Sequence, residues 1–295
     1  MLFHDWLNDS SKIILFDGGM GSEVFKRGIM PGKLPDTLNV DHPNVIFEIH
    51  KAYYDAGADM CQSNTFGSSF INLKNYKVED SIKEINLGGL ENIKKACPPN
   101  RLIVADIGPS GEFRPPVGKA SPDQWISSFE KQATFLENGV DLWHIETMSD
   151  IKEMKAALEA VKNISKKPII SSMTYKKTKK GFYTIMGDSI EKCVQFQEDY
   201  KVDVIGANCT LGSDQMVDLM KDLKHLTNKP ISIKPNAGQP RMNNNNVAVY
   251  DQPIKDFVND IGEMINLGAK IVGGCCGTSP DTIKEIRKLI DSLEN

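Results

Sequence analysis

The stretch Val272–Thr278, VGGCCGT, places two adjacent cysteines between glycines at the end of a short apolar run. Adjacent cysteines close a strained ring when they bond to each other, so a disulfide between them is unfavourable. A glycine-rich backbone does allow both sulfurs to face one metal ion, and Cys209, which ends another apolar run, would add a third thiolate. Three protein ligands leave one tetrahedral position open, as in catalytic zinc sites. The alternative is that these cysteines are small core residues.

The apolar run before the two cysteines is the last of eight, and most of these runs are followed by a segment with helical periodicity. We interpret the runs as strands at 13–16, 58–65, 102–105, 140–145, 168–173, 202–207, 231–233 and 270–272. The clearest helices are expected at 43–56, 82–96, 150–161, 213–226 and 279–293, with a further helix starting at the Ser-Pro of 121–122.

Eight strand–helix units in 295 residues favour an α/β fold, a single (β/α)8 TIM barrel with its active site at the C-terminal ends of the strands. A doubly wound open sheet is the alternative, but its glycine-rich dinucleotide fingerprint is missing. We expect residues 1–295 to form one domain, because the polar loop at 243–246 is too short for a linker.

Polar and thiol side chains recur at or just beyond the ends of the expected strands. In a barrel these ends meet on one face, where the loops build the active site. Residues far apart in the chain would therefore converge there. These residues are Asp17, Asn64, Asp106, Glu146, Cys209, Asn236 and Cys275.

The composition argues against nucleic-acid binding and against a membrane protein. With 40% hydrophobic and 25% charged residues the chain is typical of a soluble globular protein, and its net charge of −4 argues against nucleic-acid binding. The sequence contains no apolar run near the roughly 20 residues that cross a bilayer, and the first residues do not resemble a signal peptide. Six cysteines in such a chain indicate reduced thiols, so we expect a cytoplasmic protein without membrane partners.

Six runs, in order along nearly the whole chain, resemble the homocysteine S-methyltransferase family. The likeness is strongest to the N-terminal, homocysteine-binding module of cobalamin-dependent methionine synthases. GGCCGT with a preceding GANC is the specific part of this signal. The runs are DGGMGSE (17–23), QSNTFG (62–67), HIET (144–147), GANC (206–209), PNAG (235–238) and VGGCCGT (272–278).

The resemblance implies a zinc ion held by Cys209, Cys275 and Cys276, which we take as the metal-binding and catalytic residues. It implies that Asp17, Gly18 and Glu146 meet the amino group and backbone of homocysteine. It also implies that Asn236 can occupy the fourth zinc position until the thiol arrives. Without the resemblance, Asp17 is interpreted as a turn residue before two glycines, and Glu146 and Asn236 as caps or satisfied loop groups.

The chemistry agrees with this interpretation. A free thiol has a pKa near 8.5 and reacts as the thiolate, and coordination to a metal removes its proton. Zinc accepts sulfur ligands, has no redox chemistry and tolerates exchange at an open position. We therefore predict that homocysteine is activated as a zinc thiolate and methylated to methionine.

The methyl donor is less constrained. The resemblance implies a methylcorrinoid, here on a separate protein, because none of the five histidines lies in the Asp-x-His-x-x-Gly pattern of corrinoid ligands. Small cationic donors, S-methylmethionine or betaine, are the alternative, although Gly67 stands where betaine enzymes carry a tyrosine. A cationic donor favours an aromatic cage, for which the chain offers Phe66, Phe70, Phe113, Phe182 and Tyr183.

Two further hypotheses concern partners. The lysine-rich segment 175–181 lies on the predicted active face and could dock an acidic corrinoid protein, although such runs are more often solvated loops. The chain could instead be a non-catalytic zinc-binding subunit of a methyltransferase complex. An open zinc position argues against that alternative, because a pure binding subunit has no need of one.

Overall fold

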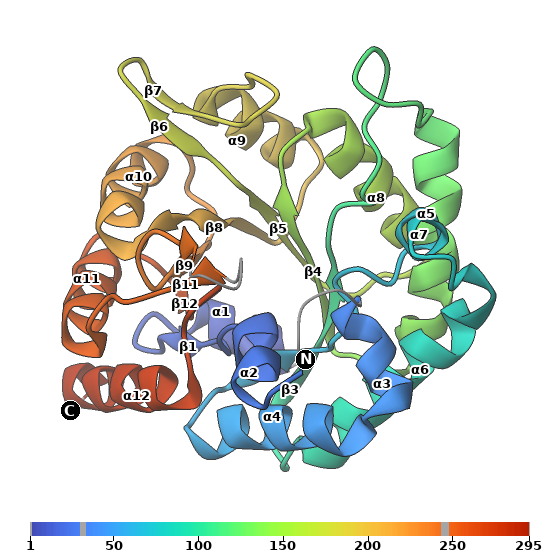
Figure 1. The fold of residues 1–295 in the computed structure, drawn as a ribbon. Coiled ribbons are helices and arrows are strands. Elements are labelled where there is room, and N and C mark those ends of the chain that lie inside the picture. The colour runs from blue at the N-terminus through green and yellow to red at the C-terminus, as the bar shows by residue number, and fades with distance from the viewer. Residues whose placement is uncertain (1, 30–33, 243–247, 295) are drawn as a thin grey trace.

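The structure is a computed structural model that describes residues 2–29, 34–242 and 248–294. Eight parallel strands stand at its centre with helices around them, which is the predicted (β/α)8 barrel (Figure 1). The polar loop expected at 243–246 lies outside the described residues. The barrel strands are β1 (Ile14–Leu15), β2 (Met60–Gln62), β3 (Leu102–Ile107), β4 (Leu142–Met148), β5 (Ile169–Met173), β8 (Val204–Gly212), β9 (Ile231–Asn236) and β12 (Ile271–Val272).

The sheet runs β1-β12-β9-β8-β5-β4-β3-β2, and every neighbouring pair is parallel. A parallel bridge between Phe16, which follows β1, and Met60 of β2 joins the two ends of this order, so the sheet closes into a barrel. Between β8 and β9 the register shifts between Asn208 and Gly212. That irregularity lies beside Cys209 and frees the end of β8 from regular pairing.

Strand side chains alternate between the inside of the barrel and the surrounding helices, as the period of two requires. The even-numbered residues of most strands, such as Met60, Val104 and Val204, form one buried cluster with Ile271 of β12, and this cluster fills the barrel interior. The odd-numbered residues, such as Ile103 and Ile205, join a second, larger cluster with the helices. Both faces of the sheet are therefore buried, which explains why its strands appear as continuous apolar runs.

The helices cover the outside of the barrel. The helix that begins at Pro122 has a capping box: Ser121 accepts a hydrogen bond from the Gln124 backbone N–H, and the Gln124 side chain accepts one from the Ser121 N–H. The α-helices are α1 (Leu2–Asn8), α2 (Met20–Lys26), α3 (Leu38–Asp41), α4 (Pro43–Asp55), α5 (Phe70–Asn75), α6 (Ile82–Ala96), α7 (Pro122–Leu136), α8 (Ile151–Ile164), α9 (Ile190–Asp199), α10 (Ser213–Leu226), α11 (Ile254–Asn266) and α12 (Pro280–Glu294). Single 3-10 turns lie at η1 (Pro35–Thr37), η2 (Glu79–Ser81) and η3 (Glu137–Gly139).

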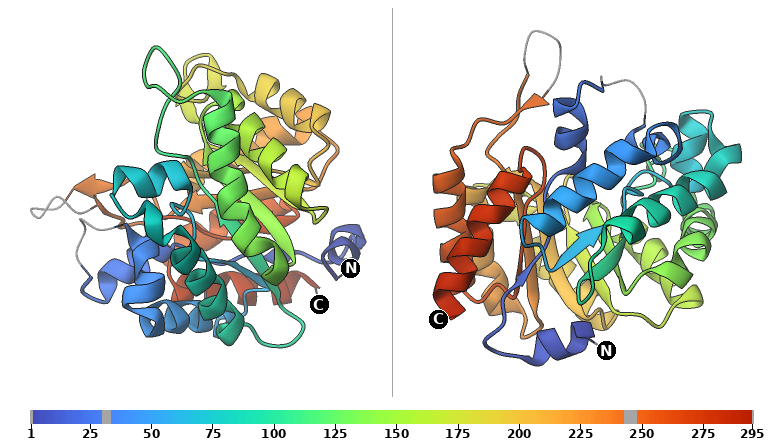
Figure 2. Two further views of the ribbon diagram at one scale, coloured as in Figure 1. Left: turned by 90° about the vertical axis from the view of Figure 1, so that its right-hand side faces the viewer. Right: turned by 90° about the horizontal axis from the view of Figure 1, so that it is seen from below.

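The two ends of the barrel differ. Helix α1 lies at the N-terminal end, where Phe3 is buried in the inner cluster, while the hairpin β10 (Arg241–Met242) with β11 (Ala248–Val249) lies at the opposite end (Figure 2). A second hairpin, β6 (Lys176–Thr178) with β7 (Gly181–Tyr183), follows β5. Helix α1 therefore covers the N-terminal end of the barrel, while the loops that follow the strands surround the C-terminal end. In the described part of the chain no helix is long and apolar enough to cross a membrane.

Candidate functional site

The three predicted cysteine ligands lie together at the C-terminal end of the barrel. The sulfur atoms of Cys209, Cys275 and Cys276 are all within 4.8 Å of one another, and each residue is half-buried. Cys209 comes from the irregular end of β8, and the other two follow β12. The convergence that the sequence predicted is therefore present in the fold.

The backbone at this point is held in unusual conformations. Cys209 and Thr210 have φ angles of 57° and 61°, in the left-handed region that residues with a Cβ rarely adopt. Gly277, with a φ of 84°, supplies the same conformation without that cost. Such strain is kept where the surrounding structure enforces it, and it gathers at functional sites.

Backbone hydrogen bonds fix the two adjacent cysteines. The N–H of Cys275 donates to the carbonyl oxygen of Pro235 at 2.8 Å, and the N–H of Ala237 donates to the carbonyl oxygen of Cys276 at 2.9 Å. The Cys276 N–H donates to the side-chain oxygen of Asn236 at 3.1 Å. Asn236 therefore lies against the cysteine pair.

The loop after β1 packs closely on the same turn. A Cβ atom added to Gly18 would lie 2.7 Å from the Thr278 hydroxyl and 2.9 Å from the Tyr53 ring, so only glycine fits. Tyr53 donates a hydrogen bond to the carbonyl oxygen of Gly19 at 2.9 Å, and the Gly19 N–H donates to the Thr278 hydroxyl at 3.0 Å. These contacts join the first and last turns of the barrel.

The three thiols influence one another's ionisation. Hydrogen bonds from Cys209 and Cys275 lower the pKa of Cys276 well below its ordinary value. The same contacts raise the pKa of Cys275 well above its ordinary value. The group therefore favours a thiolate at Cys276 and a thiol at Cys275.

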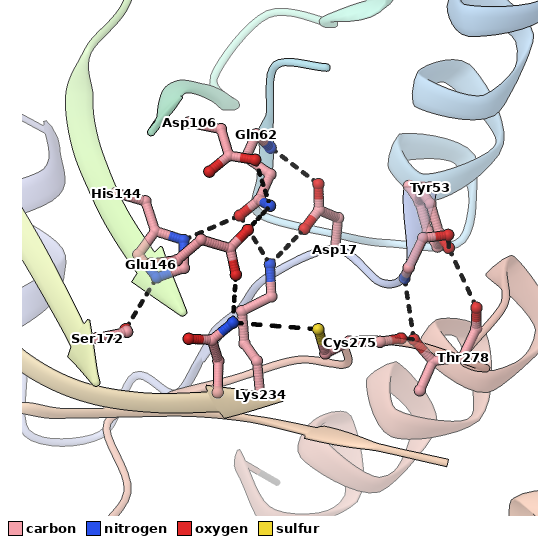
Figure 3. A network of polar contacts seen from close by, with 12 residues as sticks. Asp17, Tyr53, Gln62, Asp106, His144, Glu146, Ser172, Lys234, Cys275 and Thr278 are labelled. Atoms are coloured by element: carbon pink, nitrogen blue, oxygen red, sulfur yellow. Dashed lines mark hydrogen bonds and ion pairs between the residues drawn. The ribbon is translucent and has the colours of Figure 1, made fainter. Parts of the chain in front are cut away.

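A second cluster of polar side chains lies inside the barrel, beside the cysteines (Figure 3). Lys234, on β9, is 2% exposed, and its Nζ lies 2.8 Å from Oδ1 of Asp17 and 3.0 Å from Oε1 of Gln62. Its Nζ also lies 3.7 Å from the centre of the Phe16 ring. Burial favours a lower pKa for Lys234, but the carboxylates of Asp17 and Glu146 outweigh it and the pKa is raised. Lys234 is therefore a buried cation.

Gln62 connects the members of this cluster. Its backbone N–H donates to Oδ2 of Asp17 at 2.8 Å. Its Nε2 donates to Oδ2 of Asp106 at 2.9 Å and to Oε1 of Glu146 at 2.6 Å. Because Nε2 faces two carboxylates, Oε1 is the acceptor for Lys234 and for Nδ1 of His144, 2.9 Å away.

This orientation fixes the state of His144. Its Nδ1 carries the hydrogen that Gln62 accepts, so Nε2 accepts from the Ser172 hydroxyl at 2.9 Å. Burial and the charge of Lys234 hold the pKa of His144 well below its ordinary value. The imidazole is therefore neutral.

Glu146 links the polar cluster to the cysteines. Its Oε2 accepts a hydrogen bond from Nδ2 of Asn208, and the same nitrogen lies 4.0 Å from the Cys275 sulfur. Burial raises the pKa of Glu146. Burial, with the charge of Glu146, also raises the pKa of Asp106 well above its ordinary value. The side-chain amide of Asn208 therefore lies between the buried carboxylate of Glu146 and the sulfur of Cys275.

Of the residues predicted from strand ends, Asn64 lies outside this network. Its Nδ2 donates to Oδ1 of Asn39 and to the carbonyl oxygen of Pro35, which holds the loop after β2. The other predicted residues meet at the C-terminal end. The sequence reasoning missed Gln62, His144 and Lys234, which strand alternation could have indicated, because each is an even-numbered strand position like its inward-facing neighbours.

Comparisons with known proteins agree with this geometry. The sequence profile described as Homocysteine S-methyltransferase matches residues 14–290. The chain is 27% identical to methionine synthase of Mycobacterium leprae over 94% of this chain, and 25% identical to methionine synthase of Mycobacterium tuberculosis over 97%. It spans about a quarter of the length of these curated relatives, 24% and 25%.

A solved structure shares the fold. The homocysteine methyltransferase MmuM from Escherichia coli, in its metallated form, superposes with a TM-score of 0.82 over 98% of this chain and 100% of that chain, at 21% identity. The likeness extends over the whole barrel. The family profile spans nearly all of the chain as well. The chain therefore belongs to the homocysteine S-methyltransferase family.

Proposed function

We propose that the chain is a zinc-dependent S-methyltransferase that transfers a methyl group to the sulfur of homocysteine and forms methionine. The observation that carries the proposal is the convergence of three thiols beside a buried acidic cluster. Membership of the family supports the acceptor, and the geometry supports a metal at the thiols. A non-catalytic binding subunit has no need of an open zinc position.

The thiol group fits zinc in its donor chemistry and its dimensions. Zinc bound by three thiolates at about 2.3 Å holds the sulfurs about 3.8 Å apart in tetrahedral geometry. The three sulfurs lie within 4.8 Å of one another, close to that spacing. Cys209, Cys275 and Cys276 would hold the zinc, which would supply a Lewis acid that keeps the acceptor sulfur deprotonated at neutral pH.

The remaining residues bind and orient the acceptor. Asp17 and Glu146 supply the negative charge that retains its ammonium group. Gly18, which packs closely against Thr278 and Tyr53, would present its backbone to the substrate. Asn236 lies against Cys276 and could occupy the fourth ligand position until the thiol enters. Asn208, between Glu146 and Cys275, holds the acidic cluster at a fixed distance from the sulfurs.

A methylcorrinoid carried by a separate protein is the proposed donor. The likeness to methionine synthases supports it. S-methylmethionine and betaine are the alternatives. Phe182 is buried in the core and cannot cage a cationic donor, whereas Phe66 and Phe113 are 39% and 40% exposed. We also propose that residues 1–295 form one domain, and that the protein works in the reducing cytoplasm, because its six cysteines are free.

A parallel assay tests this function. Zinc-loaded protein is given homocysteine with methylcobalamin, S-methylmethionine or betaine, and methionine is measured. We expect methionine from at least one donor, and most with the corrinoid. Absence of methionine with every donor, together with no binding of homocysteine, would refute the proposed function.

A further inference from the structure

Tyr250 is a half-buried aromatic residue beside the thiol group, and the proposed function does not use it. It lies between β11 and helix α11, and its side chain packs against the hydrophobic core. A Cβ atom added to Gly277 would lie 2.3 Å from Cβ and 2.4 Å from Cγ of Tyr250. The tyrosine therefore lies directly on the glycine that follows Cys276, against the turn that carries two of the three thiols.

The hydroxyl of Tyr250 reaches the thiol group. The side chains of Tyr250 and Cys276 are hydrogen-bonded to each other. A phenol has an ordinary pKa near 10 and keeps its proton at neutral pH, and a metal-bound thiolate has no proton to give. The hydroxyl is therefore the donor, and the sulfur of Cys276 is the acceptor.

The segment that carries Tyr250 is fixed on both sides. Before it, strand β11 pairs with β10. After it, the Gln252 N–H donates to the carbonyl oxygen of Ala237 at 3.4 Å, and Nε2 of Gln252 donates to the Ser213 hydroxyl at 2.6 Å. The N–H of Ala237 donates in turn to the carbonyl oxygen of Cys276 at 2.9 Å. The tyrosine and the cysteine are therefore held through one residue of the loop after β9.

A hydrogen bond to a thiolate ligand has two effects on a metal site. It holds the sulfur in one orientation, and it withdraws negative charge from the sulfur, so that the ligand passes less charge to the metal. A divalent ion with three protein thiolates and one acceptor thiolate has an excess negative charge, which neutral donors stabilise. Asn208 lies near the Cys275 sulfur, with its Nδ2 at 4.0 Å, and Tyr250 has the corresponding place at Cys276.

We propose that Tyr250 is a positioning residue of the zinc site: its hydroxyl donates a hydrogen bond to the sulfur of Cys276, holds that sulfur towards the metal and limits the negative charge that it passes to the ion. This inference rests on the proposed function and adds a residue to the same site. Tyr250 acts through Cys276 and does not touch the acceptor.

Two variants separate the hydroxyl of Tyr250 from its ring. Tyr250→Phe keeps the ring that packs on Gly277 and removes only the donor, whereas Tyr250→Leu removes both. Urea unfolding of the metal-free proteins checks the packing. We expect Tyr250→Phe to unfold at the same urea concentration as the wild type, and Tyr250→Leu to unfold at a lower one, because it leaves a space beside Gly277.

The decisive measurement is made on the metal site without turnover. Co²⁺ accepts the same kinds of ligand as Zn²⁺, and its thiolate complexes have a sulfur-to-cobalt charge-transfer band in the near ultraviolet. Loss of a hydrogen bond raises the energy of the sulfur electrons, so we expect this band to shift to longer wavelength in Co²⁺-loaded Tyr250→Phe. Zinc affinity, measured by competition with a chelator, should fall roughly 10- to 100-fold.

Tyr76→Phe is the matched control. Tyr76 is 50% exposed at the end of helix α5, outside the thiol group. Removal of its hydroxyl should leave the cobalt band and the zinc affinity at their wild-type values.

The outcomes separate this inference from the proposed function. An unchanged cobalt band or an unchanged zinc affinity in Tyr250→Phe would overturn the inference, because the ring alone would then account for the contact, and the proposed function would stand. A wild type that takes up zinc but neither binds homocysteine nor forms methionine would overturn the proposed function. The cobalt band would still report the hydrogen bond of Tyr250 in that case.

Discussion

Lys234 forms a buried ion pair with Asp17 in the site. It balances Asp17 in a place that water does not reach, with side-chain exposures of 3% for both residues. Removing one partner of a buried ion pair leaves the other charge uncompensated, whereas removing both partners avoids that penalty. The pair is therefore expected to act as a unit in folding.

Substitution tests this coupling. We expect Lys234→Met to lower the free energy of unfolding by about 3–5 kcal/mol, because Asp17 is left buried and unpaired. Adding Asp17→Asn should recover part of that loss, so the double variant is more stable than the sum of the single changes predicts. Urea unfolding of the four proteins measures the cycle. Additive losses would show that the two residues do not interact.

Asp36 gives the protein a defined pH response. Burial raises its pKa to about 6, although it accepts hydrogen bonds from Ser68 and the Gly67 N–H. The folded protein therefore favours the protonated form. The resulting stabilisation is complete below the unfolded pKa of about 3.9 and is lost as the pH rises through about 6.

This pH response is tested by comparing the free energy of unfolding of the wild type and Asp36→Asn as a function of pH. Between pH 4 and 6 the contribution of Asp36 should reduce the free energy of unfolding by about 2–3 kcal/mol, and Asp36→Asn should remove this part of the pH slope. Denaturant unfolding at each pH measures it. Identical slopes in the wild type and the variant would contradict the assigned pKa.

Among the elements, the eight barrel strands could be predicted from the sequence because each is a short apolar run buried on both faces. The predicted ends of the strands were less accurate. Strand β8 continues to Gly212, past the predicted end at 207, because its last residues are polar site residues and do not continue the apolar run. The hairpins β6–β7 and β10–β11 have strands of only two or three residues, and all but β7 are exposed, so they are too short to leave an apolar pattern to detect.

The site could be predicted only in part, for a related reason. Cys209, Cys275 and Glu146 were found because they end recognisable runs. Lys234 and Gln62 were missed, since a lysine or glutamine at a strand end usually faces solvent. Their burial depends on partners from β1, β3 and β4, and that pairing exists only once the barrel has closed.

The lysine-rich segment is the exposed hairpin β6–β7 with its turn. Lys177 pairs with Asp218 at 2.6 Å, while Lys179 and Lys180 are exposed in the turn. The hairpin follows the C-terminal end of β5, on the side of the barrel where the thiols lie. The docking role for an acidic corrinoid protein stays a proposal, in which the exposed lysines of this hairpin, Lys176, Lys179 and Lys180 among them, would meet the partner.

Removing the positive charges of the β6–β7 turn tests the docking proposal. Lys179→Gln with Lys180→Gln should slow methyl transfer from a protein-bound corrinoid several-fold at low salt, and leave zinc content and transfer from free methylcobalamin unchanged. The control neutralises Lys83 and Lys95, two exposed lysines on α6. If both variants transfer methyl groups at the wild-type rate, the hairpin is only a solvated loop.

The inward-facing side chains change from apolar to polar along the barrel axis, and this change explains why the site lies at the C-terminal end. Helix α1 buries Phe3 against the inner cluster at the N-terminal end, and apolar side chains fill the interior up to the level of Phe16. Beyond that level the inward positions become polar, with His144, Ser172 and Lys234 in place of hydrophobic residues. The barrel therefore divides into a half that stabilises the fold and a half that carries chemistry.

The central claim is that three cysteines from two distant strands hold one zinc ion. Zinc per chain, measured by elemental analysis of the purified protein, tests it most directly, with Cys276→Ala as the variant and Cys97→Ala, outside the thiol group, as the control. We predict one zinc in the wild type and the control, and less than about a tenth of that in the variant, since loss of one ligand removes much of the binding energy. Full zinc content in Cys276→Ala, or a wild type that never takes up zinc, would contradict the account.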